Sequence, residues 1–126
     1  MRCINTKDNI SLLACEYGDI NFILEISNYL LHNVCEETEL IFILYNSDEG
    51  QNYYANRLGI YNYAGKLLVE FDPPQNYVFY RFEDHMKSRA GLSVVCIGEP
   101  DKYGRDAWHF GIDVVVAELY KIGLSY

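Results

Sequence analysis

The chain has 126 residues, the usual size of one domain, and half of its residues are apolar or aromatic. Its 10 basic and 18 acidic residues give a net charge of −8 at pH 7, which excludes a general affinity for nucleic acid or anionic lipid. The apolar runs at 41–45 and 114–117 are far shorter than the ~20 residues of a membrane span, and no signal peptide is recognisable. We therefore expect one cytoplasmic domain, residues 1–126, with neither a membrane nor a nucleic-acid partner.

The negative charge is unevenly distributed along the chain. Residues 1–50 contain nine acidic and two basic residues, whereas residues 51–126 contain nine acidic and eight basic residues. An acidic region of this kind attracts basic partners, although net charge also keeps a domain in solution. The asymmetry places the search for a binding function in the first two-fifths of the chain.

Residues 9–34 predict a helical hairpin. Gly18 suits the left-handed position that ends a first helix, and Asp19 suits the N-cap of a second. The apolar residues of the second helix recur at steps of three and four, which is the helical period. They are Ile20, Phe22, Ile23, Ile26, Leu30 and Val34.

The middle of the chain predicts strands. The continuous apolar run from Leu40 to Leu44 indicates a central strand that is covered on both faces. Ala64 and Gly65 lie between two β-rich segments and predict the turn of a hairpin. The expected strands span residues 39–45, 58–63, 66–71 and 92–97.

Two further helices are expected in the second half of the chain. Asp72 and Gln75, on either side of two prolines, resemble the first turn of a helix that Gly91 would end. Asp106 would cap the last helix, whose apolar residues again recur at steps of three and four. The two apolar faces are Val78, Phe79, Phe82, Met86 and Ala90, and Trp108, Ile112, Val115, Leu119 and Ile122.

The predicted fold is therefore α+β, in the order α-α-β-β-β-α-β-α. It consists of an N-terminal helical hairpin, a sheet of about four strands, and two further helices packed against that sheet. Residues 77–80 and the three valines at 114–116 also suit strands, so both of these helices have a β alternative.

Cys96 with His109 and Asp113 is the first candidate for catalysis. A thiol nucleophile needs a base, and the base needs an acceptor that orients it. Cys96 lies in a predicted core strand, however, and the four cysteines are spread singly, without CxxC spacing. We therefore expect buried, unreactive thiols at Cys3, Cys15, Cys35 and Cys96.

His32 and Cys35, beside Glu36 and Glu37, are the candidate metal ligands. Zinc needs three or four ligands that the fold brings together, and the three histidines lie far apart in the sequence. The charged residues between 83 and 89 are typical of a solvated face with weak salt bridges, and no phosphate-binding or dinucleotide motif is present. The sequence thus predicts no catalytic residue, no metal and no cofactor.

Acidic residues and tyrosines gather in the sequence around the strand predicted at 39–45. Tyrosine is frequent at protein interfaces because it buries a large area at low entropy cost. The group predicts a partner-binding surface, although tyrosines also suit the edge of a core. Its members are Glu36, Glu37, Glu39, Tyr45, Asp48, Glu49, Tyr53 and Tyr54.

In its size, its acidity, this acid–tyrosine group and its lack of a catalytic motif, the chain resembles the small acidic immunity proteins of bacterial toxin systems. The resemblance implies a protein-binding inhibitor that docks its acidic face on a basic toxin domain, often a nuclease. The acids would then stand in for substrate phosphates, with Tyr53 and Tyr54 as buried anchors. The alternatives are a small enzyme using Cys96 or His109, an acidic mimic of nucleic acid, and a subunit that self-associates through its last helix.

Overall fold

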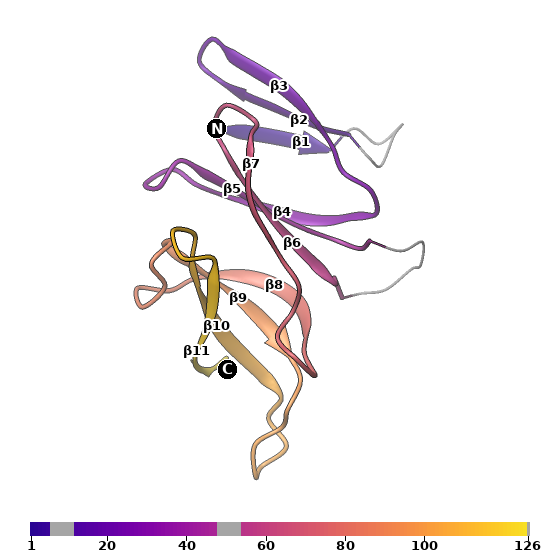
Figure 1. Ribbon diagram of the computed structural model, residues 1–126, viewed down its shortest axis with the longest axis vertical. Helices are drawn as coiled ribbons and strands as arrows, with labels where there is room; N and C mark the ends of the chain where they lie inside the picture. Colours follow the sequence, from indigo (N-terminus) through magenta and orange to yellow (C-terminus); the bar gives the residue numbers. More distant parts are fainter. Residues whose placement is uncertain (6–11, 48–53, 126) are drawn as a thin grey trace.

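The computed structural model describes residues 1–5, 12–47 and 54–125, and within these residues the chain forms eleven β-strands and no helix. The strands belong to three antiparallel sheets stacked along the long axis of the molecule, as Figure 1 shows. The described residues accordingly include no helix able to cross a membrane. The fold is all-β, and the predicted α+β fold is wrong.

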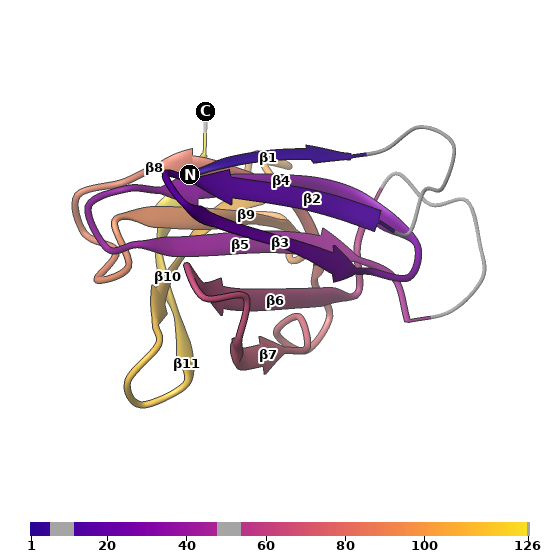
Figure 2. The same ribbon diagram turned by 90° about the horizontal axis from the view of Figure 1, so that it is seen from above.

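Each sheet is a meander, in which strands pair with their neighbours in the sequence. The first sheet contains β1 (Arg2–Asn5), β2 (Leu12–Tyr17) and β3 (Ile20–Glu25). The middle sheet contains β4 (Tyr29–Cys35), β5 (Leu40–Tyr45), β6 (Arg57–Asn62) and β7 (Leu67–Phe71). The third sheet contains β8 (Val78–Asp84), β9 (Leu92–Ile97), β10 (Ala107–Asp113) and β11 (Glu118–Leu124). Figure 2 shows the first sheet lying over β4 and β5.

Strand β5 is buried on both of its faces. Side chains alternate along a strand, so Ile41 and Ile43 face the first sheet while Phe42 and Leu44 face the third. All four side chains are inaccessible to solvent. Each fully buried side chain of this type contributes about 1.5–3 kcal/mol to folding, so β5 joins the two cores energetically as well as spatially.

The predicted helical hairpin is instead the β2–β3 hairpin followed by β4. Phe22, Leu24 and Ile26 point inward with a period of two, which is the period of a strand. Ile23, which the helical pattern placed on the buried face, is 65% exposed. The alternation over these five residues therefore outweighs the helical spacing of a longer segment.

Gly18 and Asp19 form the turn between β2 and β3. Gly18 has a φ of 58°, and Asp19 is not among the residues with positive φ. Glycine in this conformation at the first central position is typical of a type II′ turn, whose twist matches that of the flanking strands. The Gly-Asp pair thus turns a β-hairpin rather than ending one helix and capping the next.

The helix predicted after Asp72 is instead β8 and the loop that follows it. Phe79 and Phe82 both face the core although they are three residues apart. Phe79 pairs with Cys96 and Arg81 pairs with Val95, so Tyr80 is an extra residue in a β-bulge. The bulge reproduces in a strand the i, i+3 spacing that predicted a helix.

The last predicted helix is instead the β10–β11 hairpin. Val115, at the centre of the predicted apolar stripe, lies in the turn and is 94% exposed. The Asp113 carboxylate accepts hydrogen bonds from the backbone N–H groups of Val115 and Val116, at 3.0 and 3.2 Å. Ala117 then takes a φ of 57°. An aspartate-anchored turn therefore interrupts a run of valines that would otherwise continue the strand.

The predicted strands are confirmed with small shifts in their bounds, as β5, β6, β7 and β9. The run from Leu40 to Leu44 is buried on both faces, as expected. Gly65, with a φ of 80°, lies in the predicted hairpin turn between β6 and β7. The Asn62 side chain fixes that turn by accepting hydrogen bonds from the backbone of Ala64 and Lys66.

We expect Phe42→Ala to lower the free energy of unfolding by about 3–5 kcal/mol, because it leaves a cavity between the middle and third sheets. Ile23→Ala, on the exposed face of β3, serves as the control and should change that free energy by less than about 0.5 kcal/mol. Urea denaturation measures both values. Equal losses in the two variants would contradict this assignment of the core.

Candidate functional site

Five of the described turns lie along the same side of the stack of sheets, toward the left in Figure 1. Successive strands of a meander run in opposite directions, so alternate connections return to the same end. We call this part of the molecule the turn end. It comprises the connections β2–β3, β4–β5, β6–β7, β8–β9 and β10–β11, at residues 18–19, 36–39, 63–66, 85–91 and 114–117.

The β4–β5 turn presents three of the predicted acidic residues, Glu36, Glu37 and Glu39. All three are exposed, and the side chain of Glu36 is 80% exposed. Within the described part of the chain, no lysine or arginine forms an ion pair with them, and the α-amino group of Met1 is 3.8 Å from the Glu36 carboxylate. Glu37 and Glu39 therefore have no ion pair within the described residues, and Glu36 is paired with the α-amino group alone.

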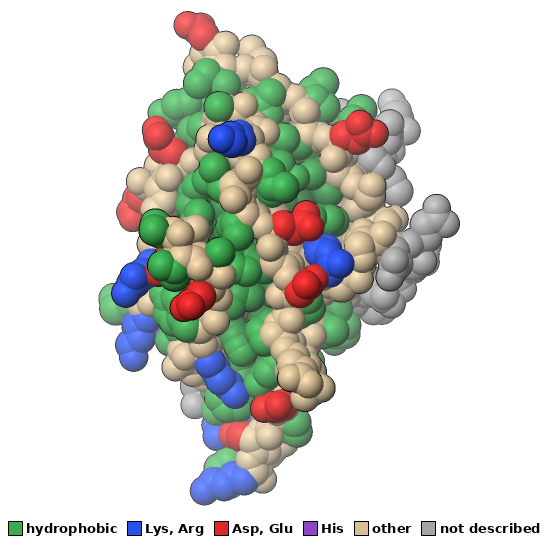
Figure 3. All heavy atoms as spheres, viewed as in Figure 1, with side chains coloured by type: hydrophobic (Ala, Val, Ile, Leu, Met, Phe, Trp, Pro, Cys, Tyr) green, Lys and Arg blue, Asp and Glu red, His purple; other side chains and the backbone are tan. Residues whose placement is uncertain are grey.

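The charge asymmetry of the sequence becomes an asymmetry between layers. The described residues before position 48, which form the first sheet, β4 and β5, carry six acidic residues and one basic residue. Residues 78–125, which form the third sheet and its loops, carry seven acidic and six basic residues. In Figure 3 most lysines and arginines accordingly lie in the lower part of the view, where the third sheet is, while acidic side chains occur over the whole face.

Two tyrosines that the sequence did not single out lie beside the acidic turn. The rings of Tyr17 and Tyr63 are 5.1 Å apart between their centroids. Burial raises the pKa of Tyr63, and the negative charges of Glu36 and Glu39 raise it further, which places its ring close to both carboxylates. The acidic residues of the turn end thus have aromatic neighbours, but these come from β2 and the β6–β7 turn.

Hollows flank the β4–β5 turn on both sides. One, of about 530 Å³, lies between this turn and the β8–β9 loop. Its lining includes the acidic residues Glu36, Glu37 and Asp84 together with His85 and Met86. The other, of about 330 Å³, is lined by Thr38, Leu40, Arg89, Ala90, Asp113 and Val114–Val116.

Large apolar side chains stand at the tips of two of these turns. Met86 is 96% exposed, Val115 is 94% exposed and Val116 is 57% exposed. Met86 lines the first hollow, and Val115 and Val116 line the second. Exposed apolar groups beside hollows of this kind are typical of an interaction surface. We call Glu36, Glu37, Asp84, Met86 and Val115 the turn surface.

The predicted tyrosines lie at the opposite end of β5. With a rise of ~3.3 Å per residue, the strand holds Tyr45 about 20 Å from Glu39. The Tyr45 hydroxyl donates a hydrogen bond to Glu70, and burial raises its pKa. Asp48, Glu49 and Tyr53 lie outside the described residues. The structure therefore does not bring Tyr45 together with Glu36, Glu37 and Glu39.

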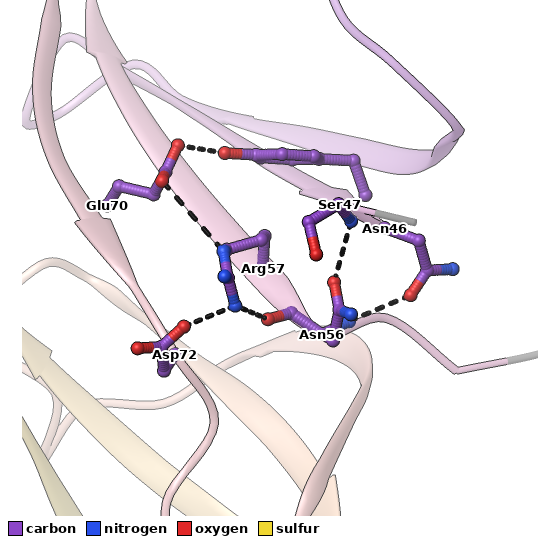
Figure 4. A network of polar contacts seen from close by, with 7 residues as sticks. Asn46, Ser47, Asn56, Arg57, Glu70 and Asp72 are labelled. Atoms are coloured by element: carbon purple, nitrogen blue, oxygen red, sulfur yellow. Dashed lines mark hydrogen bonds and ion pairs between the residues drawn. The ribbon is translucent and has the colours of Figure 1, made fainter. Parts of the chain in front are cut away.

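Near Tyr45, the carboxylates of Glu70 and Asp72 share one arginine, which Figure 4 shows between them. Arg57 lies between Glu70 and Asp72 and forms ion pairs with both. Its guanidinium also donates to the Asn56 carbonyl at 2.9 Å. Tyr54 is 40% exposed, and its ring lies 5.6 Å from that of Tyr80. The polar contacts at this end of β5 link neighbouring segments of the chain. Both carboxylates drawn in Figure 4 are paired with Arg57.

Cys96 and His109 lie on opposite faces of the third sheet. Cys96 is the cross-strand partner of Trp108 and faces the core, whereas His109 is the partner of Val95. Burial raises the pKa of the Cys96 thiol to about 12. Asp113 forms an ion pair with Arg89 at 2.9 Å. These three side chains do not form a catalytic group.

His109 instead joins Ser93 and Glu83 in a chain of hydrogen bonds that the sequence did not indicate. The Ser93 hydroxyl is 2.7 Å from His109 Nδ1, and His109 Nε2 is 3.1 Å from the Glu83 carboxylate. The Ser93 hydroxyl also donates a hydrogen bond to the backbone carbonyl oxygen of Glu83, at 3.3 Å. Ser93 is fully buried, so no substrate reaches its hydroxyl, and the network links β8, β9 and β10.

The candidate metal ligands do not converge. His32 and Cys35 lie on one strand, three residues apart, and therefore point to opposite faces of β4. Within residues 1–5, 12–47 and 54–125, no group of three or more His, Cys, Asp or Glu side chains is arranged to hold a metal ion. The charged residues between 83 and 89 lie at the end of β8 and in the β8–β9 loop.

The His109 network predicts a pH dependence of stability. Burial lowers the pKa of His109 below its ordinary value of 6.5, more than Glu83 raises it, and His85 and Arg81 lower it further. The unfolded chain therefore binds a proton that the folded chain resists, and the free energy of unfolding should fall as the pH decreases from about 7 through the lowered pKa.

His109→Gln should flatten this dependence, as measured by urea denaturation at several values between pH 7 and about pH 5. His32, whose pKa burial also lowers, keeps its own contribution in that variant. A wild-type slope retained by His109→Gln would exclude His109 as the titrating group.

Comparison with known proteins adds no relative. No family model, no curated protein and no solved structure matches the chain. The function of the turn surface is therefore argued from its own charge, shape and exposed side chains.

Proposed function

We propose that this chain is a protein-binding inhibitor that docks its turn surface on a basic protein. The class that fits best is an immunity protein acting in the cytoplasm on a nuclease-type toxin domain. The observation that supports this proposal is the hollow beside the β4–β5 turn, where Glu36, Glu37 and Asp84 lie next to the exposed Met86.

The hollow is suited to a lysine or arginine side chain of the partner. A cation that enters it meets acidic residues of the β4–β5 turn and of the end of β8, and a guanidinium can bond to both oxygens of one carboxylate. Met86 and Val115 then bury apolar area against the partner, which offsets the cost of ordering the interface. Exposed acids such as Glu39 mainly raise the association rate.

The mixed composition of the turn end favours a protein partner over mimicry of nucleic acid. Lys87 and Arg89 lie in the β8–β9 loop, the same loop that supplies His85 and Met86 to the acidic hollow. A phosphate mimic needs uninterrupted rows of negative charge, whereas protein interfaces combine apolar, acidic and basic groups.

We expect the double variant Glu36→Lys/Glu37→Lys to bind a basic nuclease-type toxin domain at least about tenfold more weakly than the wild type does, a loss of about 1.4 kcal/mol. The reversed charges repel the cation that the hollow would take. The dissociation constant is measured by calorimetry, and co-expression in cells that produce the toxin measures rescue of growth.

The matched control is Glu25→Lys/Glu99→Lys, which changes the net charge equally at exposed positions away from the turn surface. This control should bind within about threefold of the wild type, with the residual loss due to the long-range field alone. If both double variants lost affinity equally, the site would not be the turn surface.

Salt should weaken the complex mainly by slowing association. Between about 0.1 M and about 1 M salt the Debye length falls from about 10 Å to about 3 Å, so the field of the acidic turn no longer reaches an approaching partner. We expect the association rate to fall at least tenfold, as measured by stopped-flow fluorescence, while the dissociation rate changes less. An association rate independent of salt would rule out steering by these acids.

A further inference from the structure

Two of the four cysteines lie side by side on neighbouring strands of the first sheet, on the same face. Cys3 of β1 and Cys15 of β2 are directly opposed cross-strand partners, although eleven residues separate them in the sequence. Opposed residues share one face of a sheet, with Cβ atoms ~4.5–5.5 Å apart, and a disulfide needs ~3.5–4.5 Å. A small closing movement of β1 therefore brings the two sulfurs within bonding distance.

The two thiols are free and lie at the boundary between the first and middle sheets. Cys15 belongs to the core there and is 3% exposed, whereas Cys3 packs against the core from its edge and is partly exposed. An oxidant in solution therefore reaches Cys3 first, and Cys15 lies beside it on the neighbouring strand.

The two cysteines also differ in the direction of their pKa shifts. A hydrogen bond from the Cys15 thiol lowers the pKa of Cys3, and burial acts in the opposite direction. The same hydrogen bond, followed by burial, raises the pKa of Cys15. When Cys3 carries its proton, the Cys15 thiol has the Leu13 carbonyl oxygen, 3.9 Å away, as an acceptor. Cys3 therefore ionises more readily than Cys15.

His32 of the middle sheet holds Cys3 in this position. Its ring makes a hydrogen bond with the Cys3 backbone, and its Nδ1 is 2.5 Å from the Tyr29 hydroxyl. Burial lowers the pKa of His32, so the ring is neutral, accepts from Tyr29 through Nδ1, and donates to the Cys3 carbonyl through Nε2. The reactive cysteine is therefore anchored from both neighbouring strands, β2 and β4.

We infer that Cys3 and Cys15 form an oxidisable pair that closes to an intramolecular disulfide when the protein meets hydrogen peroxide. The Cys3 sulfur attacks one peroxide oxygen, the O–O bond breaks, and Cys3 becomes a sulfenic acid while a water molecule leaves. The Cys15 sulfur then attacks the Cys3 sulfur, the S–O bond breaks, and a second water molecule leaves. Two thiols are oxidised, and one peroxide is reduced to two molecules of water.

The bond would fix an edge of the molecule. Among the described strands, β1 pairs with β2 alone. In the reduced protein, backbone hydrogen bonds to β2 and side-chain packing hold β1 in place, and the disulfide would add a covalent link. Oxidation should therefore raise the midpoint of thermal unfolding, because the cross-link restricts the unfolded chain. This inference is independent of the proposed binding function.

The test is treatment of the folded, reduced protein with equimolar hydrogen peroxide, followed by alkylation and measurement of the intact mass with and without reductant. Wild type should lose two alkylatable thiols, regain both on reduction, and gain no oxygen. Cys15→Ser should instead accumulate a sulfenic acid at Cys3, trapped as its dimedone adduct. Cys3→Ser, which alters a partly exposed position on an edge strand, should form no disulfide.

Cys35→Ser is the matched control, because Cys35 is also partly exposed but has no opposed cysteine. It should form the disulfide as the wild type does and show the same rise in the unfolding midpoint. The inference is overturned if the wild-type thiols survive the oxidant, if Cys3→Ser still forms an intramolecular disulfide, or if Cys35→Ser abolishes it.

Discussion

The removal of water from both faces of β5 is the constraint on which the described structure depends. A strand of six residues that is apolar on both sides is stable only between two other layers, and the chain supplies one from the segment before it and one from the segment after it. The resulting stack sets the ends of β5 apart. The acidic turn then lies at one end, on the same side of the stack as four other turns, and Tyr45 lies at the other.

The strands β5 and β9 could be predicted because each consists mainly of consecutive apolar residues. The strands β6 and β7 could be predicted because a recognisable turn lies between them. Prediction failed where apolar residues spaced three or four apart belong to strands, bulges and turns rather than to a helix. The bulge at Tyr80 places Phe79 and Phe82 on one face, and the turn after Asp113 exposes Val115. Both devices depend on pairing between strands, which no local window contains.

Part of the candidate site could likewise be predicted from the sequence, and part could not. Glu36, Glu37 and Glu39 could be singled out because they are adjacent in the sequence and bracket a strand that is plainly buried. The other half of the hollow, Asp84 and Met86, comes from the end of β8 and the loop after it, about fifty residues later, and only the stacking of the sheets brings it there. The Cys3–Cys15 pair and the Ser93–His109–Glu83 network likewise arise from strand register, so neither leaves a motif in the sequence.

The order of the three meanders has a consequence for synthesis. Because strands pair with their sequence neighbours, each sheet closes its own hydrogen bonds as it leaves the ribosome, without waiting for distant segments. The inward face of the first sheet nevertheless remains exposed to solvent until β5 has been synthesised. One apolar face of β5 then remains exposed until the third sheet has formed. A nascent chain arrested between Phe71 and Val78 therefore displays the surface that chaperones recognise, and the last meander is the one that ends that exposure.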